Sequence, residues 1–335
     1  MSIEMPKISI ICPTYNEEKY IANCILSMIA QDIELTAIEL LFVDGRSTDK
    51  TREIIKTYQK THPFIHLIDN PEKTVPYAMN YGIKAAKGDI IMRIDAHAHF
   101  ESNYVSVLSK ALIELDATNV GAVCKTDVIN KTPKSLAIRE VLSNKFGVGN
   151  SLFRIGIDKI TVADTVPFGC YKKEVFEEYG LYNPKLTRNQ DIELNKRILR
   201  NGGTIYLVPD TFCTYYAREN FTDLAKNNFQ NGKWNILMMK YTRNLDSLSI
   251  RHFIPFIFVM SMLIPIIFSL FWLPFIWLSV VSLLAYSFLI SSISAKISAK
   301  NKLDFTSLFL AFFTLHLSYG TGSLVGLTQL ITKKK

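Results

Sequence analysis

The chain contains few cysteines and no paired cysteine motif. Its five cysteines are scattered over 335 residues, and none lies in a C-x-x-C arrangement. An odd number of widely spaced thiols excludes a disulfide framework and a structural zinc site, and it is typical of a reducing compartment. Residues 1–7 also lack the apolar core of a signal peptide. We therefore expect the N-terminal region to lie in the cytosol.

Charged side chains are missing from one long stretch, which runs from Phe253 to Ser292. The whole chain nevertheless carries a formal net charge of +8. This excess of positive charge favours an anionic partner, such as a membrane surface or a phosphorylated substrate. The N-terminal part has no basic stripe interleaved with aromatic residues, so we do not expect nucleic acid as a partner.

Short apolar runs alternate with helical patterns in the N-terminal part, which predicts an α/β fold with right-handed crossovers and a mostly parallel sheet. Acidic residues follow three of these runs: Asp44, Asp69 and Asp95. Ligands of open α/β sheets bind at this edge. Ser47 or Thr48 is expected to cap the helix that follows the second strand. The predicted strands are Ile8–Cys12, Glu39–Val43, Ile65–Ile68 and Ile90–Ile94.

Asp95 and His97 stand just past the fourth predicted strand. On an extended chain, side chains at positions i and i+2 point to the same side, so both could turn toward one divalent ion. A carboxylate and an imidazole suit Mn²⁺ or Mg²⁺ holding a diphosphate. A capped turn, with Asp95 bonded to nearby amides, is the alternative. Other motifs in the sequence are needed to decide between the metal site and the capped turn.

Four ordered groups of residues supply that context, and together they strongly resemble the family 2 glycosyltransferases, which have a GT-A nucleotide-sugar-binding fold. The Asp-x-His form is most similar to the subgroup of the succinoglycan-type glucosyltransferases, which usually carry membrane segments after the catalytic domain. The resemblance spans residues 6 to 255. The groups are Pro13-Thr-Tyr-Asn-Glu17, Val43-Asp-Gly-Arg-Ser-Thr-Asp49, Asn80 with Ala85 and Gly88-Asp89, and Arg93-Ile-Asp-Ala-His97.

The resemblance implies a role for each matching position. Pro13, Tyr15 and Glu17 would line the nucleotide site, and Asp44 would bind the base. Asp95 and His97 would hold the diphosphate and the metal ion. Many relatives have a second aspartate where this chain has His97, and a slightly softer imidazole ligand favours Mn²⁺ over Mg²⁺.

A second cluster follows at residues 187–198, where Asp191, Leu194 and Ile198 fall on one face of a predicted helix. Asp191 is then either an N-cap or a catalytic group, and the cap is the better interpretation of the residues alone. The family resemblance favours the general base for the acceptor hydroxyl, acting in a displacement with inversion. Glu193 and Arg197 are expected to form a helical ion pair.

The acceptor side is expected to involve residues with weaker signals. Asp164 lies in a segment that resembles the family's acceptor-side strand, although a simple strand with a close glycine is the alternative. Gln190 takes the place of an acid in the family's Glu-Asp motif. Lys233 and Trp234 are similar to a Gln-x-x-Arg-Trp signature with lysine in the arginine position, which weakens bidentate recognition. A helix lying against the bilayer explains Trp234 equally well.

The apolar C-terminal part is expected to cross the membrane. We predict a catalytic domain over residues 1–235, a juxtamembrane helix over 236–252, and a membrane segment over 253–335. The uncharged stretch has room for two spans with a turn near Trp272–Pro274. Placing its flanking basic residues in the cytosol agrees with the positive-inside rule, but a third crossing would carry the terminal lysines outside. Two or three spans therefore stay open.

The sequence as a whole predicts a metal-dependent, inverting, multi-pass glycosyltransferase of the cell membrane with a cytosolic catalytic domain. We expect it to move a sugar from a nucleotide diphosphate sugar, a UDP-hexose, to a lipid-linked acceptor of polysaccharide or glycolipid synthesis. Two alternatives remain: transfer to a polyprenyl phosphate, and a non-catalytic membrane-bound nucleotide-sugar sensor.

Overall fold

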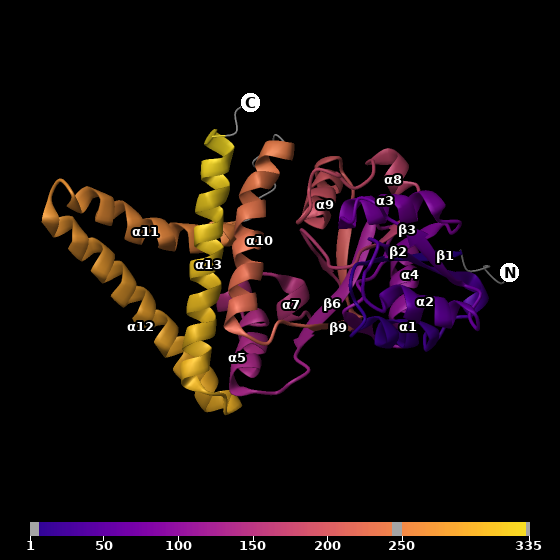
Figure 1. Cartoon of the computed structure of the whole chain (residues 1–335), viewed down its shortest axis with the longest axis horizontal. Coiled ribbons are helices and arrows are strands. Elements are labelled where there is room, and N and C mark those ends of the chain that lie inside the picture. Colours follow the sequence, from indigo (N-terminus) through magenta and orange to yellow (C-terminus); the bar gives the residue numbers. More distant parts are fainter. Residues whose placement is uncertain (1–6, 243–249, 333–335) are drawn as a thin grey trace. The chain divides into compact units, whose positions relative to one another are not determined.

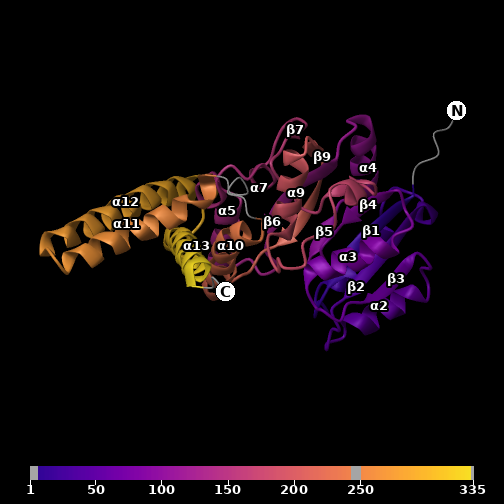
Figure 2. The same ribbon diagram turned by 90° about the horizontal axis from the view of Figure 1, so that it is seen from above.

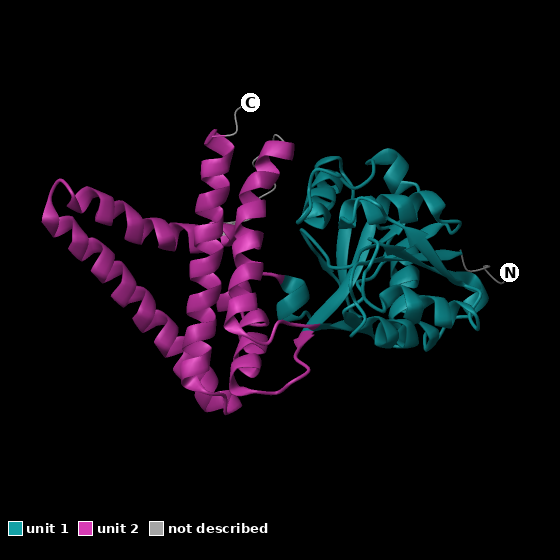
Figure 3. Ribbon diagram, in the orientation of Figure 1, with its two compact units in different colours: residues 1–125, 152–215 teal, residues 126–151, 216–335 magenta. Residues whose placement is uncertain are grey.

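The structure is a computed structural model, and it describes residues 7–242 and 250–332. The chain folds into two compact units, and each is built from two stretches of sequence (Figure 3). The first unit contains residues 1–125 and 152–215. The second unit contains residues 126–151 and 216–335, and so holds the whole uncharged stretch.

A sheet organises the first unit, and nine strands belong to it in the described part of the chain (Figure 1). The strand order is β3-β2-β1-β4-β8-β6-β9-β5, with β7 paired to β9. The strands are β1 (Ile8–Thr14), β2 (Ile38–Asp44), β3 (Ile65–Asp69), β4 (Ile90–Arg93), β5 (Ala98–Phe100), β6 (Asn119–Asp127), β7 (Thr161–Val162), β8 (Cys170–Lys172) and β9 (Ile205–Tyr216).

The sheet is parallel where the sequence shows its strand and helix alternation. β1 runs parallel to β2 and β4, and β2 runs parallel to β3. Beyond β4 the direction changes, because β8 pairs antiparallel with both β4 and β6. The predicted α/β fold is confirmed, and its sheet is mixed. The later strands arrive through loops and helices that do not repeat the strand-helix-strand crossover.

Helices cover both faces of this sheet, so successive residues of each central strand are buried on one face and then on the other. Ile8 and Ile10 of β1 pack into one core with α1, α2 and α4, whereas Ile11 packs into a second core with α3, α8 and α9. Because both faces are covered, only the strand ends can reach a ligand. The helices are α1 (Ile21–Ile29), α2 (Thr51–Gln59), α3 (Val75–Ala85), α4 (Tyr104–Glu114), α7 (Leu152–Ile155), α8 (Val175–Glu178) and α9 (Gln190–Arg200).

The second unit is helical, and a hairpin of two apolar helices projects from it (Figure 2). The helices α11 and α12 meet at the predicted turn, and Ser261 and Ser282 bridge them at 2.6 Å between their hydroxyl oxygens. The helices of this unit are α5 (Pro133–Leu142), α6 (Lys145–Val148), α10 (Phe221–Thr242), α11 (Ile254–Ser269), α12 (Ile276–Asn301) and α13 (Phe305–Thr332).

The two longest apolar helices differ in how much of them the protein covers. Both α12 and α13 are long and apolar enough to cross a membrane, whereas α11 is shorter. Only 11% of the most apolar part of α12 is buried inside the structure, against 44% for α13. At the hairpin turn, Leu270 is 83% exposed and Phe271 is 86% exposed. The hairpin therefore presents apolar side chains outward, and α13 packs inward.

Close backbone contact joins α10 to α13. An added Cβ atom at Gly322 of α13 would overlap the carbonyl oxygen of Phe229, and one at Gly326 would lie 2.7 Å from the carbonyl oxygen of Lys233. Since both contacts advance by four residues on each helix, the two helices run parallel. Only glycine allows this approach, as in other helix pairs with small interfacial residues.

The predicted limits of the catalytic domain and the juxtamembrane helix stay predictions. Residues 236–242 belong to the continuous helix α10, and residues 250–252 form a short 3₁₀ turn. The basic residue Arg243 and the terminal residues Lys333 to Lys335 lie outside the described residues.

Replacing Gly322 with alanine should separate α10 from α13, because the new methyl group has no room beside Phe229. We expect a loss of about 1–3 kcal/mol in the free energy of unfolding, which is typical of overpacking. Thermal unfolding of the purified protein measures the loss. Thr321→Ala is the control, because the Thr321 hydroxyl donates to Leu317 of its own helix. Equal melting temperatures for the two variants would contradict the packing described above.

Candidate functional site

The ends of the parallel strands bring the predicted site residues to one edge of the sheet. Thr14, Asp44 and Asp69, which end β1, β2 and β3, are in register across the three strands. The neighbouring strand β4 ends at Arg93, two residues before Asp95. The expected gathering of acids at this edge is therefore present.

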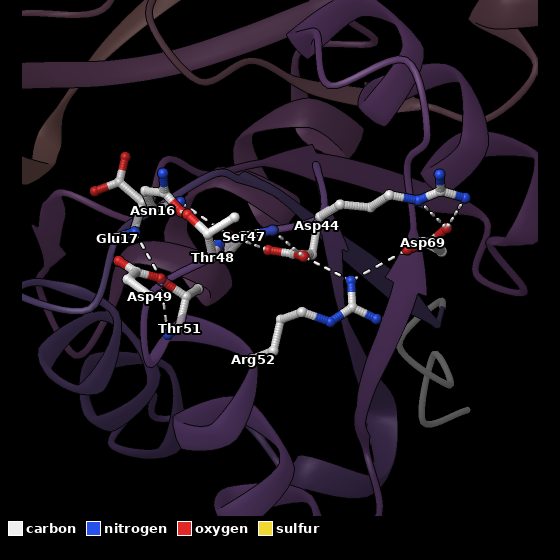
Figure 4. Close-up of polar contacts among 10 residues, drawn as sticks. Asn16, Glu17, Asp44, Ser47, Thr48, Asp49, Thr51, Arg52 and Asp69 are labelled. Atoms are coloured by element: carbon white, nitrogen blue, oxygen red, sulfur yellow. Dashed lines mark hydrogen bonds and ion pairs between the residues drawn. The ribbon is translucent and has the colours of Figure 1, made fainter.

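Asp44 is fully buried and hydrogen bonded on both oxygens (Figure 4). Its carboxylate accepts the Ser47 N–H at 3.0 Å, the Ser47 hydroxyl at 2.5 Å and Arg52 Nη1 at 2.7 Å. The hydrogen bond to Asp44 raises the pKa of Arg52. Any ligand of Asp44 must therefore reach a carboxylate that has no exposed surface in this conformation.

The expectation that Ser47 or Thr48 caps the second helix is wrong. Helix α2 begins at Thr51, and Lys50 precedes it without a side-chain cap. The hydroxyl of Ser47 donates to Asp44 instead. This long loop between β2 and α2 is shaped by the buried carboxylate, which competes successfully for the hydroxyl.

The loops that follow β1 and β2 are joined to each other (Figure 4). Asn16 adopts a left-handed backbone conformation, with φ at 55°, a region that asparagine tolerates better than most residues. Its N–H donates to the Ser47 hydroxyl at 2.8 Å, and its side-chain oxygen accepts the Thr48 N–H at 2.8 Å. The Glu17 N–H donates to Thr51 at 2.7 Å. These bonds make one continuous polar wall at the edge of the sheet.

Of the predicted nucleotide-site residues, Glu17 belongs to this wall, and Pro13 and Tyr15 precede it in the chain. Pro13 lies within β1, and Tyr15 is 46% exposed. An added Cβ atom at Gly45 would lie 3.2 Å from the Tyr15 ring, so the ring rests against the backbone that follows Asp44. An exposed aromatic ring at this edge of the sheet can stack on a flat group, such as a nucleobase.

Asp95 and His97 lie in a turn, and the extended geometry predicted for them is wrong. Strand β4 stops at Arg93, and the Ala98 N–H donates to the Asp95 carbonyl oxygen at 3.2 Å. His97 Nδ1 lies 3.3 Å from a carboxylate oxygen of Glu17. The turn and this contact therefore orient the imidazole.

The donor set fits an ion that is held largely by substrate. No group of three or more His, Cys, Asp or Glu side chains that could hold a metal gathers within residues 7–242 and 250–332. Asp95 and His97 supply two donors from one turn. Mg²⁺ and ions with similar ligand preferences are often bound by one or two protein groups together with phosphate oxygens and water. These residues suit such a site, whereas a closed protein site would need more ligands.

Asp191 does not occupy the N-cap position. Helix α9 begins at Gln190, and Asn189 precedes it with a left-handed backbone and no side-chain cap. The Asp191 carboxylate accepts the N–H of Ile192 at 2.9 Å. The predicted inward face is present, because Leu194 and Ile198 are fully buried. Asp191 therefore does not cap the helix, although its carboxylate makes one local hydrogen bond within the first turn.

The acceptor-side candidates fall in both units. Asp164 pairs with Lys196 at 3.6 Å, and Gln190 is buried with no partner for its side-chain oxygen in the part of the chain that the structure describes. Lys233 and Trp234 belong to α10 of the second unit, where the Trp234 ring stacks near Tyr241. Their roles stay predictions.

Sequence reasoning placed Arg93 in a motif but assigned it no role. The residue is only 6% exposed, and its Nε and Nη2 each donate to one oxygen of Asp95 at 3.1 Å. Burial alone would lower the pKa of Arg93, but the charges of Asp95 and Asp191 offset burial and hold that pKa above its ordinary value. A charged residue inside an apolar strand pattern was the available signal.

Comparison with known proteins identifies relatives along most of the chain. The model of the family described as glycosyl transferase family 2 matches residues 9–180. A dolichyl N-acetyl-α-D-glucosaminyl phosphate 3-β-D-2,3-diacetamido-2,3-dideoxy-β-D-glucuronosyltransferase of Methanococcus voltae is 31% identical over 240 residues, which cover 70% of this chain and 74% of the relative. The succinoglycan biosynthesis protein ExoA of Rhizobium meliloti is 28% identical over 229 residues, which cover 67% of this chain and 67% of that protein.

A solved structure extends the similarity to the fold. The mannosyltransferase PcManGT from Pyrobaculum calidifontis, in complex with GDP-Man and Mn²⁺, matches with a TM-score of 0.61 and 16% sequence identity. The match covers 99% of this chain and 89% of that protein. At this identity the likeness concerns the fold, and it agrees with a GT-A architecture followed by apolar C-terminal helices.

Proposed function

We propose, because this chain belongs to glycosyl transferase family 2, that it is a membrane-anchored, inverting glycosyltransferase that moves a hexose from a UDP-hexose to a lipid-linked acceptor. One observation carries the proposal. The polar wall, Asp44 and the Asp95 turn all belong to one edge of one sheet, where the parallel strands β1, β2 and β4 end.

The donor nucleotide is assigned to the wall that joins the first two loops. The exposed ring of Tyr15 offers a stacking surface for the base, and Pro13 and Glu17 flank it in sequence. Asp44 shapes the loop beneath through Ser47 and Arg52, whether or not it also contacts the base.

Asp95 and His97 would hold Mn²⁺ or Mg²⁺ together with the diphosphate. When bound, the ion would neutralise the negative charge that develops on the diphosphate leaving group. The orientation of the Asp95 carboxylate by Arg93 and of the His97 ring by Glu17 favours such binding. The Mn²⁺ in the Pyrobaculum mannosyltransferase supports the assignment.

Asp191 would act as the general base. Its carboxylate accepts the proton of the acceptor hydroxyl while the hydroxyl oxygen forms a bond to the anomeric carbon. The bond from that carbon to the diphosphate breaks on the opposite face, which inverts the configuration. Asp191 is free for this task because only one local hydrogen bond to its carboxylate is described, from the N–H of Ile192, and such bonds leave oxygen lone pairs available.

The acceptor is assigned to lipid-linked sugars. The name of the Methanococcus voltae relative includes a dolichyl-linked sugar phosphate as its acceptor, and this supports the class. Asp164, Gln190, Lys233 and Trp234 are the candidate acceptor-side residues. Direct transfer to a polyprenyl phosphate is the alternative acceptor chemistry, and a nucleotide-sugar sensor without turnover is the non-enzymatic one.

The hairpin of α11 and α12 is assigned to the membrane as two crossings. Its apolar side chains face outward, and Trp272 and Trp277 near the turn suit the far interface, where tryptophan is enriched. α13 would not cross, because it packs along α10, which carries charged residues over its whole length. Two crossings keep both ends of the hairpin in the cytosol, which agrees with the positive-inside rule.

The metal assignment is tested by binding of UDP in the presence of Mn²⁺. Asp95→Ala should weaken this binding by at least about tenfold and leave metal-free UDP affinity unchanged, whereas His97→Asp should retain activity and shift preference toward Mg²⁺. Calorimetry measures both affinities. His99→Asp, which changes an exposed histidine of the same segment, is the matched control. Wild-type affinity in Asp95→Ala would remove the metal role.

The catalytic proposal is tested by transfer of radiolabelled sugar from UDP-hexoses, and from GDP-mannose for comparison, to extracted membrane lipids. Asp191→Asn should lower turnover by roughly 10²-fold or more, with donor affinity and melting temperature nearly unchanged. Glu193→Gln should have a milder effect, since Glu193 pairs with Arg197. Unchanged turnover in Asp191→Asn would exclude the base. Binding of donor without any transfer by the wild type would favour the sensor.

The topology is tested by labelling of single cysteines with a membrane-impermeant maleimide in intact cells and in inverted vesicles. Because all five native cysteines are buried, they should give little background. Ser269→Cys, at the hairpin turn, should react from the outside, and Thr328→Cys, near the end of α13, should react from the cytosolic side. Labelling of Thr328→Cys from the outside would show a third crossing.

A further inference from the structure

One short segment of the first unit, residues 155–162, exposes apolar side chains together. Six large apolar residues are exposed in the part of this unit that the structure describes, and three of them belong to this segment. The three are Ile155, Ile160 and Val162, and Val162 is 65% exposed. The other three are spread over the chain, and they are Tyr15 after β1, Leu26 of α1 and Ile113 of α4.

The backbone of this exposed segment is held by contacts on both sides. Phe153, just before it, and Ile157, within it, pack against the cores of the first unit. At its end β7 pairs antiparallel with β9, and the N–H of the next residue, Ala163, donates to the carbonyl oxygen of Ile205 at 3.0 Å. The apolar side chains are therefore presented outward by a backbone that is fixed to the sheet.

A second protein chain is a poor match for this cluster. β7 has two residues, and so short an edge strand offers little template for pairing with another strand. A specific protein interface buries about 800 Å² on each partner, from roughly 20–30 residues a side. Three side chains fall far below that size.

A lipid surface matches the cluster better. Peripheral membrane segments combine apolar side chains, which enter the boundary of the acyl chains, with basic residues that meet anionic headgroups. Lys159 is exposed within the segment and Arg154 precedes it, against one acid, Asp158. Space outside the segment is open, because an added Cβ atom at Gly156 would meet no atom of the described residues within 4 Å.

A weak contact is sufficient for a chain that is already tethered to the membrane. The segment closely follows residues 126–151 of the second unit, the unit to which the proposed membrane hairpin belongs. A tether makes the second contact intramolecular and gives it a high effective concentration. A small apolar cluster can then bind where it would not bind alone.

We propose that residues 155–162 dock the first unit on the lipid surface, with Ile155, Ile160 and Val162 reaching the boundary of the acyl chains. The proposal rests on the membrane anchoring proposed above. Val162 lies two residues before Asp164, a candidate acceptor-side residue. Docking thus brings this side of the catalytic unit to the surface that carries a lipid-linked acceptor.

Quenching of a fluorophore by brominated lipids tests the contact. The full chain, whose native cysteines are buried, carries bimane at Val162→Cys in vesicles of phosphatidylcholine and phosphatidylglycerol with brominated or ordinary acyl chains. Quenching by bromine should be at least about twofold greater than at Leu26→Cys or Ile113→Cys, which are exposed apolar positions of the same unit. Equal quenching at the three positions would overturn the docking.

Bimane at Leu284→Cys of α12 reports on the membrane hairpin separately. Leu284 is exposed in the stretch assigned to the bilayer, so bromine should quench its label strongly. Quenching at Leu284 without quenching at Val162 overturns the docking alone. Absence of quenching at Leu284 overturns the proposed anchoring and the docking together.

A charge placed in the cluster gives a second test. With bimane at Ile160→Cys, the further change Val162→Asp should reduce quenching by about half or more, because a carboxylate resists transfer into the acyl boundary. Ile113→Asp makes a similar change at an exposed residue of α4 and should leave the quenching unaltered. Equal quenching with the two changes contradicts the docking. So does a bimane signal that follows the protein-to-lipid ratio without bromine quenching, because a second copy of the chain would then cover the segment.

Discussion

A carboxylate that leaves water must find donors, and in the first unit the acids at the sheet edge find them in arginine. Asp44 has no exposed surface and is held by Arg52, while Asp95 is held by both Nε and Nη2 of Arg93. A carboxylate that is buried without such partners costs free energy. The pairing supplies hydrogen bonds to both carboxylates at the edge of the sheet where we propose that the donor binds.

The same need for hydrogen-bond partners explains why the loops that form the site are held in place relative to each other. Hydrogen bonds from Asn16 and Glu17 join the loop after β1 to the loop after β2. Each bond joins residues that follow the neighbouring parallel strands β1 and β2, so the register of these strands sets their spacing. A rigid sheet that carries tied loops is the arrangement that places catalytic groups reproducibly.

In the second unit, two helices are joined by close contact between their backbones, whereas charged pairs join the elements at the site of the first unit. Gly322 and Gly326 let α13 approach α10 until no side chain fits between them. The hairpin of α11 and α12 has the opposite character, since large apolar side chains such as Phe271 are left outside. The helices α10 and α13 therefore pack against each other within the protein, whereas the hairpin leaves large apolar side chains exposed.

Local patterns in the sequence determined the order of strands and helices, the acids at the strand ends, the family and the hairpin turn. The periodicity of apolar residues and the positions of turn-forming residues depend only on neighbours in the chain. The tertiary structure alone decided the rest. It showed that Ser47 serves Asp44 and not a helix cap, that Asp95 sits in a turn, and that β8 reverses the sheet. These outcomes depend on contacts between residues far apart in sequence, whose partners are selected by the register of packed elements.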